Sequence, residues 1–184
     1  MVLEKAFIPA GHNTVNMFVI VKDSAGKFIK FVEDVFGGME RTAVRTPDRD
    51  GTLIHSEIQI GDATIMIADS KPDWPFTPAF IQIYVKDAQA VLNKAKAAGA
   101  KVVTEVNGFY NGFNLARFQD SWGNIWWLYE PDNKKKGTEQ KSDTNWHNKK
   151  PSEIYTSLLN AMSSLKLLYK PRFVIGTTIS NDRH

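Results

Sequence analysis

Residues 18–23 read FVIVKD and residues 82–87 read QIYVKD, so an apolar run that ends in Val-Lys-Asp returns 64 residues later. Self-similarity of this kind indicates a duplicated unit. Each run is followed by a stretch in which apolar residues recur with the period of an α-helix: AGKFIKFVEDVFGG after the first and AQAVLNKAKAAGA after the second. Both stretches stop at glycine, Gly37-Gly38 and Gly99, the residue that most readily takes the left-handed conformation that closes a helix.

Three strand-like runs follow each helical stretch, at about 40–46, 52–60 and 63–69 in the first half and 101–106, 113–119 and 125–130 in the second. Turn signals such as Gly61-Asp62 and Gly123-Asn124 separate them. Each half therefore predicts a β-α-β-β-β module. Between the halves, the segment DSKPDWPFTP holds three prolines, which continue neither a helix nor a central strand, and it is interpreted as a linker.

These patterns predict an α+β fold: two tandem βαβββ modules that form curved mixed sheets around a pocket, plus a C-terminal helical extension. We expect the first module at residues 1–70, a Pro-rich linker at 71–78, the second module at 79–131, a polar basic linker at 132–150, and a C-terminal helix and short strand at 151–184.

The C-terminal segment PSEIYTSLLNAMSSLKLLY opens with Pro-Ser-Glu, which favours the start of a helix. Its apolar residues recur at helical spacing: Ile154, Leu158, Leu159, Met162 and Leu165. Such a helix needs an apolar partner, either its own module, a second copy of the chain or another protein. Pro171 ends the helix, and residues 173–179 have the β-branched content of a short strand.

Strand alternation assigns side chains to the two faces of each predicted sheet. The apolar rows that we expect to pack on the helices are Met17, Val19 and Val21 in one module and Ile81, Ile83 and Val85 in the other. The alternate residues should line the concave side: Asn16, Phe18 and Ile20, and Phe80, Gln82 and Tyr84. In residues 52–60, a polar row of His55, Glu57 and Gln59 faces either water or the pocket. The mixture of aromatic and amide side chains on the concave side suits a small-molecule pocket.

Composition excludes several classes of site. The chain of 184 residues has no cysteine, so thiolate nucleophiles, disulfides and Cys-rich zinc or iron–sulfur sites are impossible. Phosphate loops, dinucleotide fingerprints and hydrolase nucleophile motifs are absent from the sequence. No signal peptide or long apolar run is visible, and we expect a cytoplasmic protein without a membrane partner.

The net charge of +3 is unevenly distributed. Residues 1–131 carry 13 Lys plus Arg against 15 Asp plus Glu, whereas residues 132–184 carry 10 against 5. The basic excess therefore belongs to the tail, where it is typical of a solvated linker, and we expect no nucleic-acid partner.

The βαβββ duplication, together with the strings FGG, DGTLIHSEIQIGDATIMIAD, YVKDAQAVLNKAKAAGA and DSWGNIWWL, resembles the vicinal oxygen chelate superfamily. This superfamily includes glyoxalase I, extradiol dioxygenases and bleomycin resistance proteins, and the likeness is greatest to its PhnB-like members. It covers about residues 12–131 and leaves out the tail. It implies a pocket built by two modules, within one chain or across a homodimer, and in the enzymes a divalent metal ion.

The metal ligands of typical enzyme members, commonly two His and a Glu, fall by this resemblance on Asn16, Phe80 and Trp127, with Ile65 as the symmetric fourth place. An amide and two rings are poor metal donors. We therefore expect no metal at these positions and no cofactor.

Several other side chains are candidates for chemistry. His55 and Glu57 could act as a base and its neighbouring acid, or could begin a displaced metal site with His12; the alternative is a hydrogen-bonded His on a sheet surface. His147 and His184 are expected to be exposed and without function. Trp126 should enter the core, and Trp127 should enter the pocket beside the aromatic residues Phe18, Phe80, Tyr84 and Tyr129. This aromatic set could stack a flat ligand or fill a collapsed pocket.

Arg117 could meet a carboxylate or phosphate of a ligand, or could pair with Glu57 or Asp69. The sequence thus predicts metal-independent binding of a small, partly aromatic molecule by these residues. The alternatives are a metal-dependent lyase, isomerase or dioxygenase with a displaced metal site, and a ligand-free scaffold that assembles through its tail.

Overall fold

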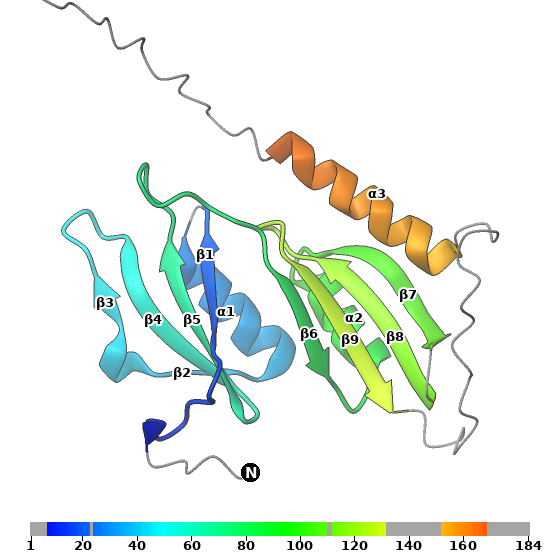
Figure 1. Ribbon diagram of the computed structural model, residues 1–184, viewed down its shortest axis with the longest axis horizontal. Helices are drawn as coiled ribbons and strands as arrows, with labels where there is room; N and C mark the ends of the chain where they lie inside the picture. Colours follow the sequence, from blue (N-terminus) through cyan, green and yellow to red (C-terminus); the bar gives the residue numbers. More distant parts are fainter. Residues whose placement is uncertain (1–6, 23, 110–111, 132–151, 169–184) are drawn as a thin grey trace, which may run out of the picture.

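The computed structural model describes residues 7–22, 24–109, 112–131 and 152–168, and it contains two sheets, each with a helix on one face (Figure 1). The first module comprises β1 (Met17–Val21), α1 (Ala25–Phe36), β2 (Met39–Glu40), β3 (Thr46–Pro47), β4 (Leu53–Ile60) and β5 (Ala63–Asp69). The second comprises β6 (Phe80–Tyr84), α2 (Ala88–Ala97), β7 (Lys101–Phe109), β8 (Phe113–Gln119) and β9 (Ile125–Pro131). The predicted α+β fold of two sheet modules is confirmed.

The two sheets share one topology, β1-β5-β4-β2 and β6-β9-β8-β7, with β3 added beside β4. In each sheet the first strand pairs in parallel with the last strand of its module, and the other pairs are antiparallel. The long crossover that a parallel pair requires is supplied by the helix and the strands that follow it. The internal repeat therefore specifies both sheets.

The prediction of one strand at residues 40–46 is wrong. The structure divides this segment into β2, a 3₁₀ turn at Thr42–Val44 (η2) and β3. The Arg41 backbone N–H still donates to the Glu57 carbonyl at 2.8 Å, but the chain then leaves the ladder. Pro47 has no amide hydrogen to donate, and the register shifts between Thr46 and Pro47.

Helix α1 begins and ends where the sequence predicts. The Ser24 hydroxyl accepts from the Lys27 N–H at 3.3 Å, and Gly37 closes the helix with φ 69°. The helix buries one face, formed by Ala25, Phe28, Ile29, Phe31, Val32 and Val35. Helix α2 begins similarly at Asp87, whose carboxylate accepts from the Ala90 N–H at 2.8 Å.

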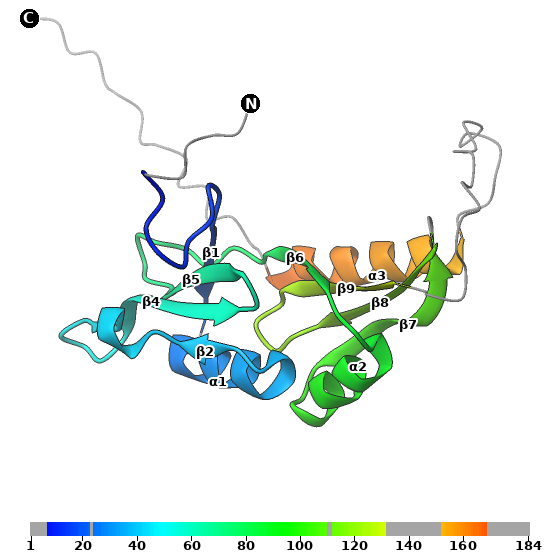
Figure 2. The ribbon, with the colours of Figure 1, turned by 90° about the horizontal axis from the view of Figure 1, so that it is seen from below.

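The aromatic side chains of α1 pack on the second sheet as well as on the first. The Phe36 ring centroid lies 4.6 Å from that of Trp126 on β9, and the Phe28 ring meets Trp122 edge-on at 5.2 Å. Phe31 contacts Phe118 of β8 at 6.1 Å. The two modules consequently share one hydrophobic core. Figure 2 shows α1 and α2 on one side of the sheets, so both remaining faces, here called the open faces, lie on the opposite side.

The predicted division of side chains between the two faces is confirmed for the first strands: Val19, Val21 and Ile81 are buried in the core, and Met17, Ile83 and Val85 pack at its edge. Trp126 is fully buried, as predicted.

The assignment of Ile65 as the counterpart of Trp127 is wrong by one residue. Ile65 pairs with Met17 as Trp126 pairs with Ile81, and Ile65 lies in the core. Because side chains alternate along a strand, the true counterpart of Trp127 is Met66.

The C-terminal helix α3 (Glu153–Leu168) lies on the open face of the second sheet, on the side opposite α1 and α2 (Figure 2). Leu158 and Leu165 form a small apolar cluster with Ile125 of β9. The predicted helix is thus present, and its own second module is the apolar partner that it contacts. Leu159 and Met162 point outward and are exposed. Residues 132–150 and 173–179, expected as a linker and a strand, lie outside the described residues.

None of the helices within the described ranges has the length and apolar character required to span a membrane.

The shared core predicts that damage to α1 destabilises the second module. Replacing Phe28, which is fully buried, with Ala should reduce the free energy of unfolding by about 3–5 kcal/mol. Urea titration followed by the fluorescence of the second-module tryptophans should show one transition, at a lower urea concentration than in the wild-type chain. A transition that separates into two steps, with the tryptophan step unmoved, would contradict the shared core.

Candidate functional site

The open face of the first sheet carries a charged cluster centred on Glu57. Glu57 Oε1 lies 3.3 Å from His55 Nε2, and its Oε2 lies 3.2 Å from both His12 Nε2 and Arg41 Nη1. His55 comes from the same face of β4, His12 from the segment before β1, and Arg41 from the turn after β2. Arg41 also donates to the Ala10 carbonyl at 3.3 Å. The cluster therefore fastens the N-terminal segment to the sheet.

The carboxylate of Glu57 is buried but keeps its charge. Burial raises its pKa, yet hydrogen bonds from His55 and His12, the charge of His12 and the hydrogen bond from Arg41 together outweigh burial, so the pKa of Glu57 lies below its ordinary value. A buried carboxylate with three cationic or polar partners is a fixed anion rather than a proton donor at neutral pH.

The predicted grouping of His12, His55 and Glu57 is therefore found in the structure. The two imidazole nitrogens contact different oxygens of the carboxylate, so each ring is directed at its own partner. Within residues 7–22, 24–109, 112–131 and 152–168, no three His, Asp or Glu side chains form a group that could hold a metal ion. His147 and His184 lie outside these ranges.

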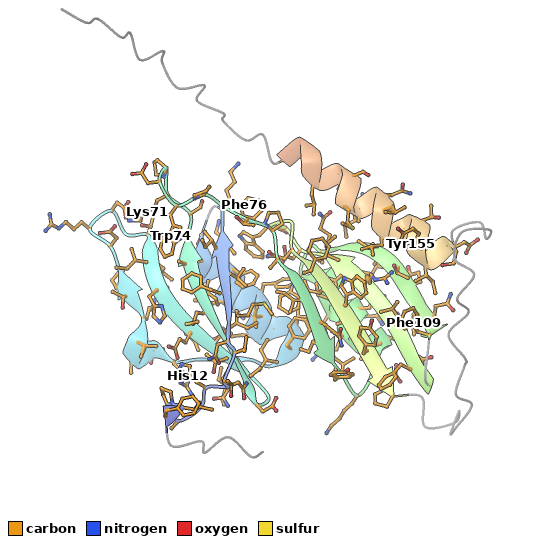
Figure 3. The ribbon with its side chains drawn as sticks, in the orientation of Figure 1. His12, Lys71, Trp74, Phe76, Phe109 and Tyr155 are labelled. Carbon is orange, nitrogen blue, oxygen red and sulfur yellow. The ribbon has the colours of Figure 1, made fainter. Side chains whose placement is uncertain are left out.

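Aromatic side chains border this cluster. The Phe18 ring on β1 is 40% exposed and lies 6.4 Å from His55 and 5.6 Å from Trp74. Figure 3 shows Trp74 and His12 at opposite ends of the first sheet, so Phe18 lies between the linker and the charged cluster. Trp74 was not predicted as a site residue, since a linker residue has no periodicity that would fix where its ring packs.

The open face of the second sheet carries an aromatic row. Tyr84 of β6 lies 5.9 Å from Tyr129, and Tyr129 stacks on Trp127 at 6.5 Å with an interplanar angle of 16°. Gln82 donates to the Tyr84 hydroxyl at 3.2 Å. Phe80 and Tyr84 are 48% and 65% exposed. The predicted pocket residues of this module therefore share one face, as strand alternation indicated.

Arg117 lies under α3 on the same open face. It is 3% exposed, and its guanidinium carbon is 4.0 Å from the centre of the Trp127 ring. Its Nη1 donates to Thr104 Oγ1 at 3.3 Å and to the Ile154 carbonyl of α3 at 2.9 Å. Burial lowers the pKa of Arg117, and Tyr129 partly opposes this.

The predicted pairing of Arg117 with Glu57 or Asp69 is wrong. Glu57 pairs with Arg41 and two histidines. The Asp69 carboxylate accepts hydrogen bonds from the backbone N–H groups of Ser24, Ala25 and Leu53. Arg117 and these two acids belong to different sheets.

The positions that the resemblance assigns to metal ligands make other contacts here. Asn16 holds a turn, since its Nδ2 donates to the Asn13 carbonyl at 2.7 Å and its Oδ1 accepts from the Asn13 N–H at 2.9 Å. Phe80 and Trp127 present rings to the open face. The three residues offer one amide, which is already hydrogen-bonded to Asn13, and no imidazole or carboxylate. They therefore do not fit a divalent metal ion.

Comparison with known proteins places these features in context. A family model described as "Glyoxalase/Bleomycin resistance protein/Dioxygenase superfamily" matches residues 14–128. An uncharacterised protein of Mycobacterium bovis is 31% identical over 123 residues, which cover 61% of this chain and 80% of that protein.

Among solved structures, TioX from Micromonospora sp. ML1 is similar with a TM-score of 0.52 at 19% identity, covering 64% of this chain and 98% of TioX. The PhnB protein of Bacillus cereus is similar with a TM-score of 0.52 at 17% identity, covering 64% and 99% of the two chains. At these identities the likeness establishes the fold alone. Helix α3 lies beyond the segment that the family model matches.

The lowered pKa of Glu57 predicts a loss of stability in acid. A carboxyl group whose folded pKa lies below its ordinary value of 4.5 stabilises the fold above pH 4.5, and this contribution disappears as the pH falls through the folded pKa. Glu57→Gln should cost about 1–3 kcal/mol at pH 7 and should flatten the fall in melting temperature below pH 4.5. Glu105→Gln, an exposed carboxylate on β7, is the matched control. Equal acid sensitivity of Glu57→Gln and wild type would contradict this role.

Proposed function

Because the chain belongs to the glyoxalase/bleomycin resistance protein/dioxygenase superfamily, we propose that it binds a small, partly aromatic molecule on the open faces of its two sheets, without a metal ion. The observation that carries this proposal is the exposure of aromatic rings on those faces. Phe18, Phe80 and Tyr84 each leave 40% or more of their surface in water. Clustered exposed rings on a folded chain are typical of an interaction surface.

The surroundings of these rings support a ligand of mixed character. A flat molecule could stack on Phe18 or Tyr84, because ring faces attract other rings and cations. His55 of β4, Gln82 of β6 and Arg117 of β8 supply polar groups on the same open faces. A few polar groups within an apolar and aromatic surface are what orient a small molecule in its site.

The residues at the family's metal positions support binding without a metal. Asn16, Phe80 and Trp127 leave no set of donors for a divalent ion, and metal catalysis needs several donors that converge on one point.

A second candidate function is favoured by the cluster at Glu57. Two imidazole nitrogens each lie within 3.3 Å of one oxygen of the Glu57 carboxylate, and nitrogen and oxygen donors of these types bind zinc and related ions. Such a displaced site would support a metal-dependent reaction of the same superfamily, with His55 as the base and Glu57 as a metal ligand.

Metal content separates the two candidates. Elemental analysis of protein purified without chelator should find less than about 0.1 transition-metal ion per chain. Stoichiometric zinc, nickel, manganese or iron that is lost from a His55→Ala, Glu57→Gln double variant would instead favour the metal-dependent enzyme.

Binding itself can be tested by a thermal-shift screen of diverse aromatic compounds. A ligand that binds only the folded chain raises its melting temperature by mass action. We expect at least one compound to raise it, and we expect Phe18→Ala or Tyr84→Ala to reduce that rise by half or more. Val44→Ala is the control, because Val44 is an apolar residue of η2 that is exposed to nearly the same extent as Phe18. No response from any compound would contradict the proposal and favour a scaffold.

A further inference from the structure

We propose that Arg117 binds the carboxylate of an aromatic carboxylic acid on the open face of the second sheet, and that this carboxylate takes the place of the Ile154 carbonyl of α3. The inference rests on the proposed function, since it names the ligand class for that surface. It adds that the chain's own helix competes with the ligand.

Among the described residues, no carboxylate pairs with the positive charge of Arg117. In the described part of the chain its hydrogen-bond acceptors are a hydroxyl, Thr104 Oγ1, and a backbone carbonyl, Ile154 O. No ion pair of Arg117 occurs among the described residues. A charged side chain that is only 3% exposed normally has a partner of opposite charge, because burial removes its hydration. An anion is therefore the ligand that this residue lacks.

Neighbouring donors on the same face also lack hydrogen-bond partners within the described part of the chain. Arg117 Nε, Gln119 Nε2 and Trp127 Nε1 are buried and have no hydrogen-bond partner among the residues that the structure describes. Arg117 and Gln119 are two residues apart on β8, and Arg117 pairs directly with Trp127 on β9, so the three side chains lie on one open face. One of these donors belongs to the guanidinium and two lie on its neighbours, which favours a ligand rich in acceptor oxygens. A carboxylate can accept two parallel hydrogen bonds from a guanidinium.

The aromatic side chains beside Arg117 indicate that the carboxylate ligand also carries an aromatic ring. Trp127 and Tyr129 stack in nearly parallel planes, and the exposed Tyr84 ring continues the row toward β6. A ring attached to the carboxylate could extend along this row while its oxygens reach Arg117.

Helix α3 closes the site through its first two turns. Its Ile154 carbonyl accepts from Arg117, and its Ser157 Oγ lies 2.9 Å from Thr104 Oγ1. Leu158 and Leu165 cover Ile125, with Trp127 packed beside them. The helix thus gives Arg117 a neutral acceptor where a ligand would give it a charged one, and hydrogen bonds between charged groups are the stronger. A ligand that binds only the state with α3 displaced shifts the population toward that state.

The ligand class can be tested with a matched pair of probes, 1-naphthoate and its neutral amide, 1-naphthamide, on the full chain by isothermal calorimetry. We expect the naphthoate to bind at least 10-fold more tightly, and we expect Arg117→Gln to abolish this preference. Gln119→Ala, which keeps the cation and removes one unpaired donor, should reduce naphthoate binding about threefold and provides a second reading if Arg117→Gln fails to fold.

Displacement of α3 can be tested by a reversible crosslink. The chain has no cysteine, so Thr104→Cys, Ser157→Cys introduces the only pair, at side chains whose oxygens are 2.9 Å apart. Oxidation should weaken naphthoate binding at least 10-fold, and reduction should restore it. If the crosslink does not form, Leu158→Ala, Leu165→Ala should loosen α3 and tighten naphthoate binding. Equal affinity with α3 locked and free, or loosened and native, would overturn the displacement.

The outcomes distinguish this inference from the proposed function. Equal binding of both probes would overturn the carboxylate assignment while leaving aromatic binding in place. Absence of binding by either probe, together with a silent thermal-shift screen, would overturn both.

Discussion

The packing of α1 against the second sheet is the interaction on which the rest of the structure depends. Phe36 and Phe28 insert between the modules and contact Trp126, a fully buried residue that belongs to the other half of the chain. Dispersion and burial of these rings supply much of the shared core. This packing places both helices on one side of the sheets, and it thereby leaves two adjacent open faces on the other (Figure 2). Every candidate site residue lies on or beside those faces.

The two open faces differ in charge. On the first sheet, Glu57 is surrounded by His12, His55 and Arg41, so its charge is compensated inside the fold. On the second sheet, the acceptors of Arg117 within the described ranges are neutral, and α3 covers it. A compensated cluster stabilises the position of the N-terminal segment, whereas an uncompensated cation retains capacity to bind. We therefore propose different tasks for the two faces: the first holds structure and stacks a ring, and the second recognises an anion.

The repeat and the alternation of side chains predicted the modules, both helices and the faces of Val19, Trp126 and Trp127, because these depend on local periodicity. Features set by contacts distant in sequence were not predictable. The pairing partner of Arg117 depends on which sheet it joins and on where α3 docks, and Trp74 reaches Phe18 from a linker without periodicity. Ile65 shows a further limit, since an error of one residue in strand register transfers a side chain to the other face.

We propose that this chain binds its ligand on the open faces of its two sheets, without a metal ion. A crystal structure of the full chain, grown with an aromatic carboxylate and no chelator, tests this proposal. We expect electron density for the ring beside Trp127 and Tyr129, with the carboxylate oxygens within hydrogen-bond distance of Arg117 and α3 moved from its present position. An ion coordinated by His12, His55 and Glu57 that contacts the ligand, or a ligand bound on the helix side of the sheets, would show that the proposed binding mode is wrong.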